Sequence, residues 1–169
     1  MNKIEVYHAG TEKIINPIWN YGRKNLDFGP GFYLTDIYDQ AVIWAKRKSR
    51  ERKSVPLINV YKLDRKSILD NYKNKIFSQY NREWLDFIVA CRNLQKIWMK
   101  YDYIEGGVAD DRVIDTINLY IQGFISEERA LENLFYLKPN NQICINNQEI
   151  LNNHLEYLNT LELPSDELL

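Results

Sequence analysis

The sequence contains little of what a metal centre or a disulfide framework requires. Its 169 residues include two histidines and two cysteines, Cys91 and Cys144, which lie far apart. Structural zinc sites need closely spaced ligands, and small disulfide-held folds use more cysteines. We therefore expect two reduced, buried thiols in a cytoplasmic protein without a metal site.

Long apolar runs and an excess of one charge are also missing. The first residues, MNKIEVYHAG, lack the apolar run of a signal peptide, and no window approaches the ~18 apolar residues of a membrane span. The 22 basic and 23 acidic residues leave a net charge of −1. This balance argues against bulk attraction to nucleic acid or to a membrane, and we expect no membrane partner.

Hydrophobic residues, in contrast, are plentiful. They make up 45% of the chain, which is enough for a packed core. The length fits one domain over residues 1–169, burying roughly 70% of the unfolded surface.

The periodicity of the chain predicts strands and helices in irregular alternation. Alternating apolar residues predict strands over 3–10, 31–35, 55–64, 101–107, 140–147 and 155–164. Helical spacing predicts helices over 36–52, 81–95, 109–123 and 126–137, and a brief helix near Ile150. The expected N-caps are Asp36, Asn81, Ser126 and Asn146. This order favours an α+β fold over a regular parallel α/β sheet.

The longest stretch without periodicity, residues 11–30, runs into the segment NLDFGPGFYLTD. Such long loops in compact domains tend to be functional. Gly29 and Gly31 can let a ligand approach the backbone, while Phe28, Phe32 and Tyr33 offer flat faces. A tight turn before a strand is the competing interpretation.

Two further positions are candidates. His8 ends the first strand, and the backbone groups of Ala9 and Gly10 can hold a planar amide. An ordinary half-buried histidine explains the same pattern. Gln142 begins a short strand between two asparagine pairs, and alone it is a typical surface amide.

Together these segments resemble a bacterial family of unknown function in the ADP-ribosyltransferase-like superfamily. The resemblance rests on YHAG, GRKNLDFGPGFYLTD, QAVIWA, GGVADDRVIDTINLYIQG and NNQICINN, from His8 to about Leu158. It implies a split, twisted β-sheet core with flanking helices that binds NAD⁺ as its substrate. By this resemblance His8 bonds the adenosine ribose, the backbone of Gly10 holds the nicotinamide amide, and Tyr33 stacks on the nicotinamide.

The resemblance also places Gln142 where a glutamate often bonds the 2′-hydroxyl of the nicotinamide ribose. An amide oxygen can accept that hydrogen bond but carries no charge and is no general base. This argues against a poor nucleophile such as arginine as the acceptor. Asp110, Asp111 or Glu149 can supply the missing carboxylate, although helix capping also explains them.

In the loop before the glycines, Arg23 and Asn25 can bind the pyrophosphate of NAD⁺, unless Arg23 is simply solvated. The resemblance implies a mono-ADP-ribosyltransferase toxin of a toxin–antitoxin or phage-defence system. Its partners would be a protein or nucleic-acid acceptor and an antitoxin. A catalytically silent NAD- or nucleotide-binding module, and an interaction protein without a ligand, remain as alternatives.

Overall fold

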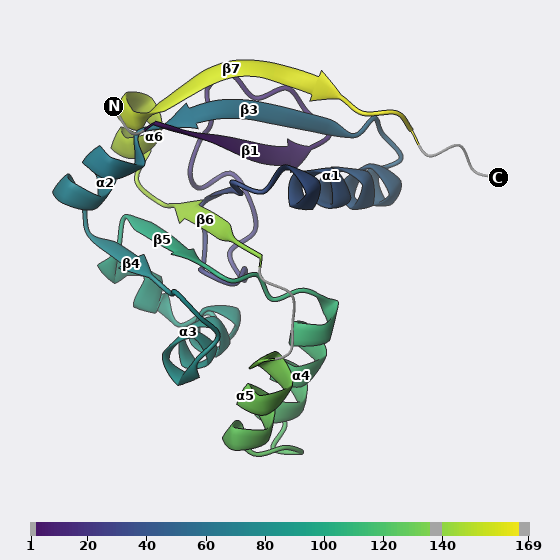
Figure 1. Ribbon diagram of the computed structural model, residues 1–169, viewed down its shortest axis with the longest axis vertical. Coiled ribbons are helices and arrows are strands. Elements are labelled where there is room, and N and C mark those ends of the chain that lie inside the picture. The colour runs from purple at the N-terminus through teal and green to yellow at the C-terminus, as the bar shows by residue number, and fades with distance from the viewer. Residues whose placement is uncertain (1–2, 136–139, 166–169) are drawn as a thin grey trace.

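Two β-sheets form the centre of the computed structural model, which describes residues 3–135 and 140–165 (Figure 1). The first sheet has the strand order β1-β3-β7, and both of its strand pairs are antiparallel. The second has the order β2-β6-β5-β4, in which β4 and β5 pair in parallel. The strands are β1 (Ile4–Gly10), β2 (Phe32–Leu34), β3 (Leu57–Leu63), β4 (Asn74–Ile76), β5 (Tyr103–Gly106), β6 (Gln142–Ile145) and β7 (Leu155–Glu162). The predicted α+β class is confirmed.

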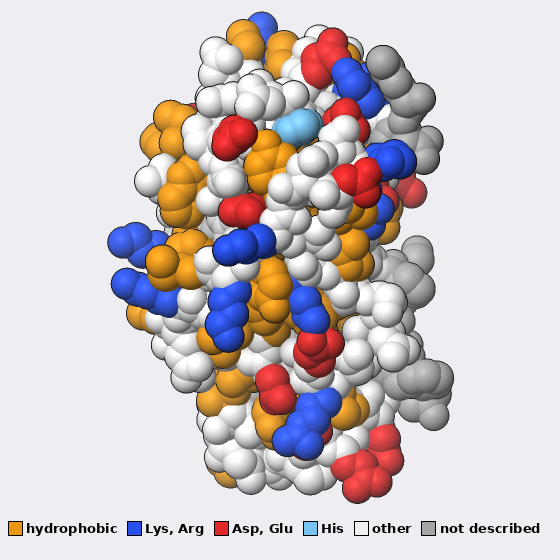
Figure 2. All heavy atoms as spheres, turned by 90° about the vertical axis from the view of Figure 1, so that its left-hand side faces the viewer, with side chains coloured by type: hydrophobic (Ala, Val, Ile, Leu, Met, Phe, Trp, Pro, Cys, Tyr) orange, Lys and Arg blue, Asp and Glu red, His pale blue; other side chains and the backbone are white. Residues whose placement is uncertain are grey.

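Helices pack against each of the two sheets. Figure 1 shows α1 beside the three-stranded sheet, and α3, α4 and α5 at the opposite end of the molecule. The helices are α1 (Tyr38–Arg52), α2 (Arg65–Asn71), α3 (Arg82–Arg92), α4 (Asp111–Ile121), α5 (Glu127–Phe135) and α6 (Gln148–His154), with a 3₁₀ helix η1 (Lys96–Lys100). Figure 2 shows the side that carries α2 and β4, where basic side chains gather across the middle of the face.

Three apolar clusters hold these layers together. One lies between the four-stranded sheet and α3 to α5, a second between the two sheets, and a third between the three-stranded sheet and α1. Cys91 and Cys144 belong to the first cluster as free, buried thiols, as predicted.

The two sheets meet at one isolated bridge. Tyr7 of β1 pairs with Thr35, just after β2, through two backbone hydrogen bonds of 2.8 and 3.0 Å. This bridge brings the end of β1 beside the segment that carries the glycines, and so positions the candidate site.

Two helix starts differ from the sequence prediction. Asp36 does not cap α1: the N-cap is Ile37, because the Thr35 hydroxyl accepts its backbone N–H and holds the turn. The cap of α6 is Asn147, one residue after the predicted Asn146, and its side chain accepts from the backbone N–H of Glu149.

Two other predicted helix starts are confirmed. Asn81 caps α3 through the N–H of Trp84, and Ser126 precedes α5 and accepts from Arg129. The predicted continuation of α5 to residue 137 lies outside the described residues.

Candidate functional site

His8 lies where the two sheets meet. Its Nδ1 is 2.7 Å from the carbonyl oxygen of Tyr33, and its ring stacks on Phe32 with centroids 4.4 Å apart. Because a carbonyl oxygen only accepts, we assign the proton to Nδ1, which leaves Nε2 as an acceptor. Burial, and then the charge of Lys48, lower the pKa of His8 to about 3. A neutral imidazole with one free acceptor suits a hydroxyl donor such as a ribose.

Positive charge gathers around the end of β1. Lys48 of α1 donates from Nζ to the carbonyl oxygen of Ala9 at 2.8 Å, and Arg52 donates to the Thr11 hydroxyl at 3.4 Å. Burial, and then the nearby charges of Arg52 and Arg23, lower the pKa of Lys48 to about 8. Cations held this close together attract an anionic ligand.

The backbone of Ala9 and Gly10 differs from the expectation of an open pair. β1 continues through Gly10, which pairs with Leu57, and Ala9 pairs with Ile58. The Ala9 carbonyl also accepts the Lys48 hydrogen bond. The strand ends at Gly10, as predicted, but the Ala9 carbonyl already has a partner.

The glycines before β2 make room for the protein's own side chains. Gly29 has a φ of +76°, and a Cβ there would lie 2.5 Å from the Trp98 ring. A Cβ on Gly31 would overlap the Sγ atom of Cys144. Both positions therefore need glycine for packing, which corrects the expectation that their surroundings are open to a ligand.

The aromatic side chains of this segment divide between core and site. Phe28 is 0% exposed and packs with Phe77 and Phe87, so its predicted role as a flat face for a ligand is wrong. Phe32 is also buried, beneath His8. Tyr33 remains half-buried.

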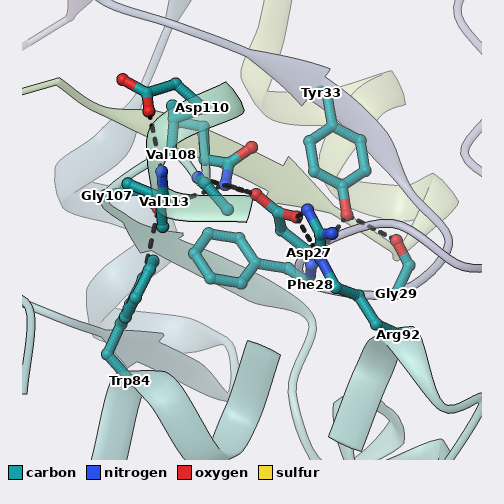
Figure 3. Close-up of polar contacts among 12 residues, drawn as sticks. Asp27, Phe28, Gly29, Tyr33, Trp84, Arg92, Gly107, Val108, Asp110 and Val113 are labelled. Carbon is teal, nitrogen blue, oxygen red and sulfur yellow. Dashed lines mark hydrogen bonds and ion pairs between the residues drawn. The ribbon is translucent and has the colours of Figure 1, made fainter. Parts of the chain in front are cut away.

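The Tyr33 hydroxyl closes the glycine segment onto itself. It donates to the Gly29 carbonyl at 2.5 Å and accepts from the Phe28 N–H at 3.0 Å (Figure 3). Burial raises the pKa of Tyr33 well above its ordinary range, so the phenol keeps its proton.

Tyr33 and Gln142 share one face of the four-stranded sheet. Tyr33 pairs with Cys144 across β2 and β6, and Gln142 lies two residues before Cys144. Alternate residues of a strand point to the same side, so both side chains face the first apolar cluster. Gln142 is only 4% exposed.

The Gln142 amide belongs to a buried network around Asp27 (Figure 3). Its Nε2 donates to Asp27 Oδ2 at 3.0 Å and to the Gly107 carbonyl at 3.2 Å. Arg92 donates to Asp27 Oδ1 from Nη2 at 2.6 Å and from Nε at 3.1 Å, and the Ala109 N–H donates to Oδ2 at 3.0 Å. We call these five residues the Asp27 network.

The remaining predicted residues lie outside this network. Arg23 and Asn25 are exposed in the loop before it. Asp110 caps α4 by accepting from the N–H groups of Arg112 and Val113, so capping explains it. The side chain of Asp111 lies outside the described residues.

The comparisons with known proteins identify one family. Residues 4–157 match the model of a family described as protein of unknown function, DUF3990. The chain belongs to this family. No curated protein and no solved structure matches it. Membership of DUF3990 leaves the ADP-ribosyltransferase-like superfamily a prediction from the sequence.

Among the described residues, no group of three or more His, Cys, Asp or Glu side chains is placed to hold a metal ion. The described helices also include none that is long and apolar enough to cross a membrane.

The structure reveals a second buried carboxylate in this DUF3990 chain. Glu105 of β5 accepts from Arg65 Nε at 2.9 Å, from the Tyr103 hydroxyl at 2.7 Å and from Asn141 Nδ2 at 3.1 Å. We call these four residues the Glu105 network. Glu105 pairs with Ile143, so it points to the sheet face opposite Gln142.

Asp27 and Arg92 were not predicted from the sequence. Asp27 lies inside the segment that drew attention, but its partners are 65, 82 and 115 residues away. No local spacing signals such a contact. The only hint is an acidic residue between Leu26 and Phe28, both of them apolar.

Proposed function

We propose that this chain is an NAD-dependent mono-ADP-ribosyltransferase. It cleaves the bond between nicotinamide and ribose and transfers ADP-ribose to a protein or nucleic-acid acceptor. We further propose that it acts in the cytoplasm as the toxin of a toxin–antitoxin or phage-defence system, a role that rests on the resemblance of its motifs.

One observation carries the proposal: the strands that hold His8, Tyr33 and Gln142 are far apart in sequence and lie next to one another in the fold. His8 of β1 bonds the backbone of Tyr33 in β2, and Tyr33 shares its sheet face with Gln142 of β6. The two sheets, joined at the bridge between Tyr7 and Thr35, support the split core that the motifs imply.

The chemistry of each group suits a part of NAD⁺. The Nε2 atom of His8 can accept from an adenosine ribose hydroxyl. Arg23, Lys48 and Arg52 provide positive charge for the diphosphate. Both hydrogen bonds of the Gln142 side chain use Nε2, and Oε1 has lone pairs for the 2′-hydroxyl of the nicotinamide ribose.

The reaction balances without a redox partner. The bond from the ribose C1′ to the nicotinamide nitrogen breaks, and its electron pair leaves with nicotinamide, which becomes neutral. Positive charge develops on the ribose, as in glycoside hydrolysis. An oxygen or nitrogen of the acceptor bonds to C1′ and releases one proton to water. Groups aimed at the developing charge stabilise the transition state more than the ground state.

A second function is favoured by the burial of Gln142. At 4% exposure, with its nitrogen held by two acceptors, Gln142 also fits a structural role. The alternative is a catalytically silent module that binds NAD⁺ or another nucleotide. In this case His8→Ala abolishes binding in calorimetry, while nicotinamide release stays at background.

Labelled NAD⁺ tests the two functions together. The protein is incubated with NAD⁺ labelled in the adenosine and with cell lysate, and labelled protein, nucleic acid and free ADP-ribose are separated. We expect labelling by the wild type, its loss in Tyr33→Ala, and no change in Tyr21→Ala, since Tyr21 is 82% exposed. Equal signals from wild type and Tyr33→Ala would refute the enzyme, and turnover lost in Gln142→Ala would refute the silent module.

A further inference from the structure

We propose that Asp27 is a positioning residue for Gln142. Through its hydrogen bond to the amide, Asp27 supplies the negative charge that a glutamate at position 142 would carry. This inference rests on the proposed function. It assigns two tasks to two residues: Gln142 accepts the ribose hydroxyl, and Asp27 supplies charge and fixes the direction of the amide.

The orientation of the Gln142 amide follows from its neighbours. Both atoms within hydrogen-bond distance of Nε2, Asp27 Oδ2 and the Gly107 carbonyl oxygen, can only accept. The reversed amide would point Oε1 at two acceptors, which is repulsive. Asp27 and the Gly107 carbonyl therefore hold Nε2 toward themselves and direct Oε1 away from both acceptors.

The same neighbours explain why a glutamine stands at this position. A carboxylate at 142 would face Asp27 at about the 3.0 Å that now separates Nε2 from Oδ2. Two like charges this close in a buried site cannot both ionise without a large cost. Glutamine at 142 and aspartate at 27 are thus complementary.

The charge of Asp27 is held firmly in place. The guanidinium of Arg92, the Ala109 N–H and the Gln142 amide all donate to it. Asp27 Oδ2 pushes electron density through the Gln142 amide onto Oε1, because linked hydrogen bonds polarise one another. In a buried site this charge also attracts the positive ribose of the transition state.

A charge exchange between the two positions tests the inference. The variants are Asp27→Asn, Gln142→Glu and the double variant D27N/Q142E, with Asp110→Asn as a control. Asp110→Asn makes the same chemical change at a helix cap, where asparagine serves equally well. In the double variant the amide introduced at position 27 can donate to the carboxylate introduced at position 142, so the hydrogen bond persists with reversed polarity.

The melting temperature tests the contact between positions 27 and 142 without requiring any reaction. Relative to the wild type, Gln142→Glu is expected to lose more melting temperature at pH 8 than at pH 5, because its folded state retains a shared proton that rising pH removes. D27N/Q142E should recover much of the loss at pH 8. A Gln142→Glu melting temperature that follows the wild type at every pH would overturn the contact, even if Asp27→Asn does not fold.

The rate of nicotinamide release tests the positioning role of Asp27. We expect Asp27→Asn to lower kcat about tenfold or more, with KM for NAD⁺ within about twofold of the wild type. D27N/Q142E should exceed both single variants in kcat. Wild-type kcat in Asp27→Asn, or a double variant no faster than Gln142→Glu, would overturn the role of Asp27.

The two readouts separate the inference from the proposed function. If the wild type releases nicotinamide no faster than Tyr33→Ala, the reaction itself is refuted, and a catalytic use of Asp27 falls with it. Suppose instead that the wild type releases nicotinamide, but the melting temperature of D27N/Q142E is what the two single variants predict by addition. The proposed function then stands, and Asp27 is not its positioning residue.

Discussion

The Asp27 and Glu105 networks lie on opposite faces of the same sheet and are built from the same kinds of group. Each has one buried carboxylate, one arginine and one amide, and the two amides are neighbours, Asn141 and Gln142. They differ in what they hold. Glu105 joins strand residues to the start of α2, whereas Asp27 draws the long 11–30 loop onto β6 and α3.

We infer from this difference that Glu105 has a structural role, whereas Asp27 lies beside the candidate site. All the partners of Glu105 are side chains of the sheet, of α2 or of the residue before β6. Asp27, by contrast, comes from a loop and directs an amide on the face shared with Tyr33. We therefore expect that breaking either network lowers the denaturant concentration at which the protein unfolds. The region of the chain that loses protection should differ between the two.

The largest expected effect comes from removing either carboxylate. Asp27→Ala and Glu105→Ala each leave a partly buried arginine without its partner, which costs about 3–5 kcal/mol of unfolding free energy. Urea unfolding measures this cost. Hydrogen exchange then locates it: we expect lost protection in residues 11–30 for Asp27→Ala and in α2 for Glu105→Ala. The same exchange pattern in both variants would contradict the comparison.

A smaller loss of unfolding free energy is expected from a substitution at Gly31, which lets β2 pack closely against β6. A methyl group on Gly31 would overlap Cys144 Sγ and lie 3.1 Å from the Ile145 carbonyl oxygen. Gly31→Ala should therefore cost about 1–3 kcal/mol. Cys144→Ala in the same chain should restore part of it by removing the sulfur.

Gly22 is the matched control for that substitution. A methyl group there would meet nothing within 4 Å, so Gly22→Ala is expected to leave the unfolding free energy unchanged or slightly raised. Equal losses from both substitutions would show that packing against Cys144 does not determine the cost.

The tyrosine hydroxyls that anchor the 11–30 loop should have effects of about 1–2 kcal/mol. Tyr33 makes two hydrogen bonds to the loop, and Tyr61 of the other sheet makes one, to the Ile14 carbonyl at 2.6 Å. Tyr33→Phe should destabilise more than Tyr61→Phe in urea unfolding. The reverse order would show that the loop is anchored mainly on the three-stranded sheet.

Local physics explains which parts of the fold could be predicted. The strands with alternating apolar residues and the caps at Asn81 and Ser126 depend on neighbours within a few residues, and the structure confirms them. α2 spans seven residues, too few for a helical period to show. Asp36 does not cap α1 because the helix starts one residue later, after Ile37, whose backbone N–H donates to the Thr35 hydroxyl.

The site itself could be predicted only in part. Motif resemblance placed His8, Tyr33 and Gln142 on strands, and the structure brings these strands together. The glycines suggested an open surface because a sequence shows which residues have no side chain. It does not show which other side chains pack into the space beside them. Here Trp98 and Cys144 fill it. The pairing of Asp27 with Arg92 depends on tertiary contacts alone.

The smallest expected effect is a pH dependence from His8, which lies on the Glu105 side of the sheet with Phe32. Its pKa falls from 6.5 to about 3 in the folded state, chiefly through burial. Between these values the unfolded chain binds more protons than the folded one, so stability is complete above pH 6.5 and declines as the pH falls toward 3. From pH 7 to pH 5.5 the expected loss is about 1 kcal/mol.

Urea unfolding of wild type and His8→Asn at both pH values isolates this contribution. Asparagine can keep the donor to the Tyr33 carbonyl but does not titrate, so the variant should lose less stability on acidification. An equal loss in both proteins would mean that His8 takes up its proton in the folded state. The imidazolium would then lack the acceptor atom that the proposed ribose contact needs, so the same titration also tests the NAD⁺ site from the side opposite Gln142.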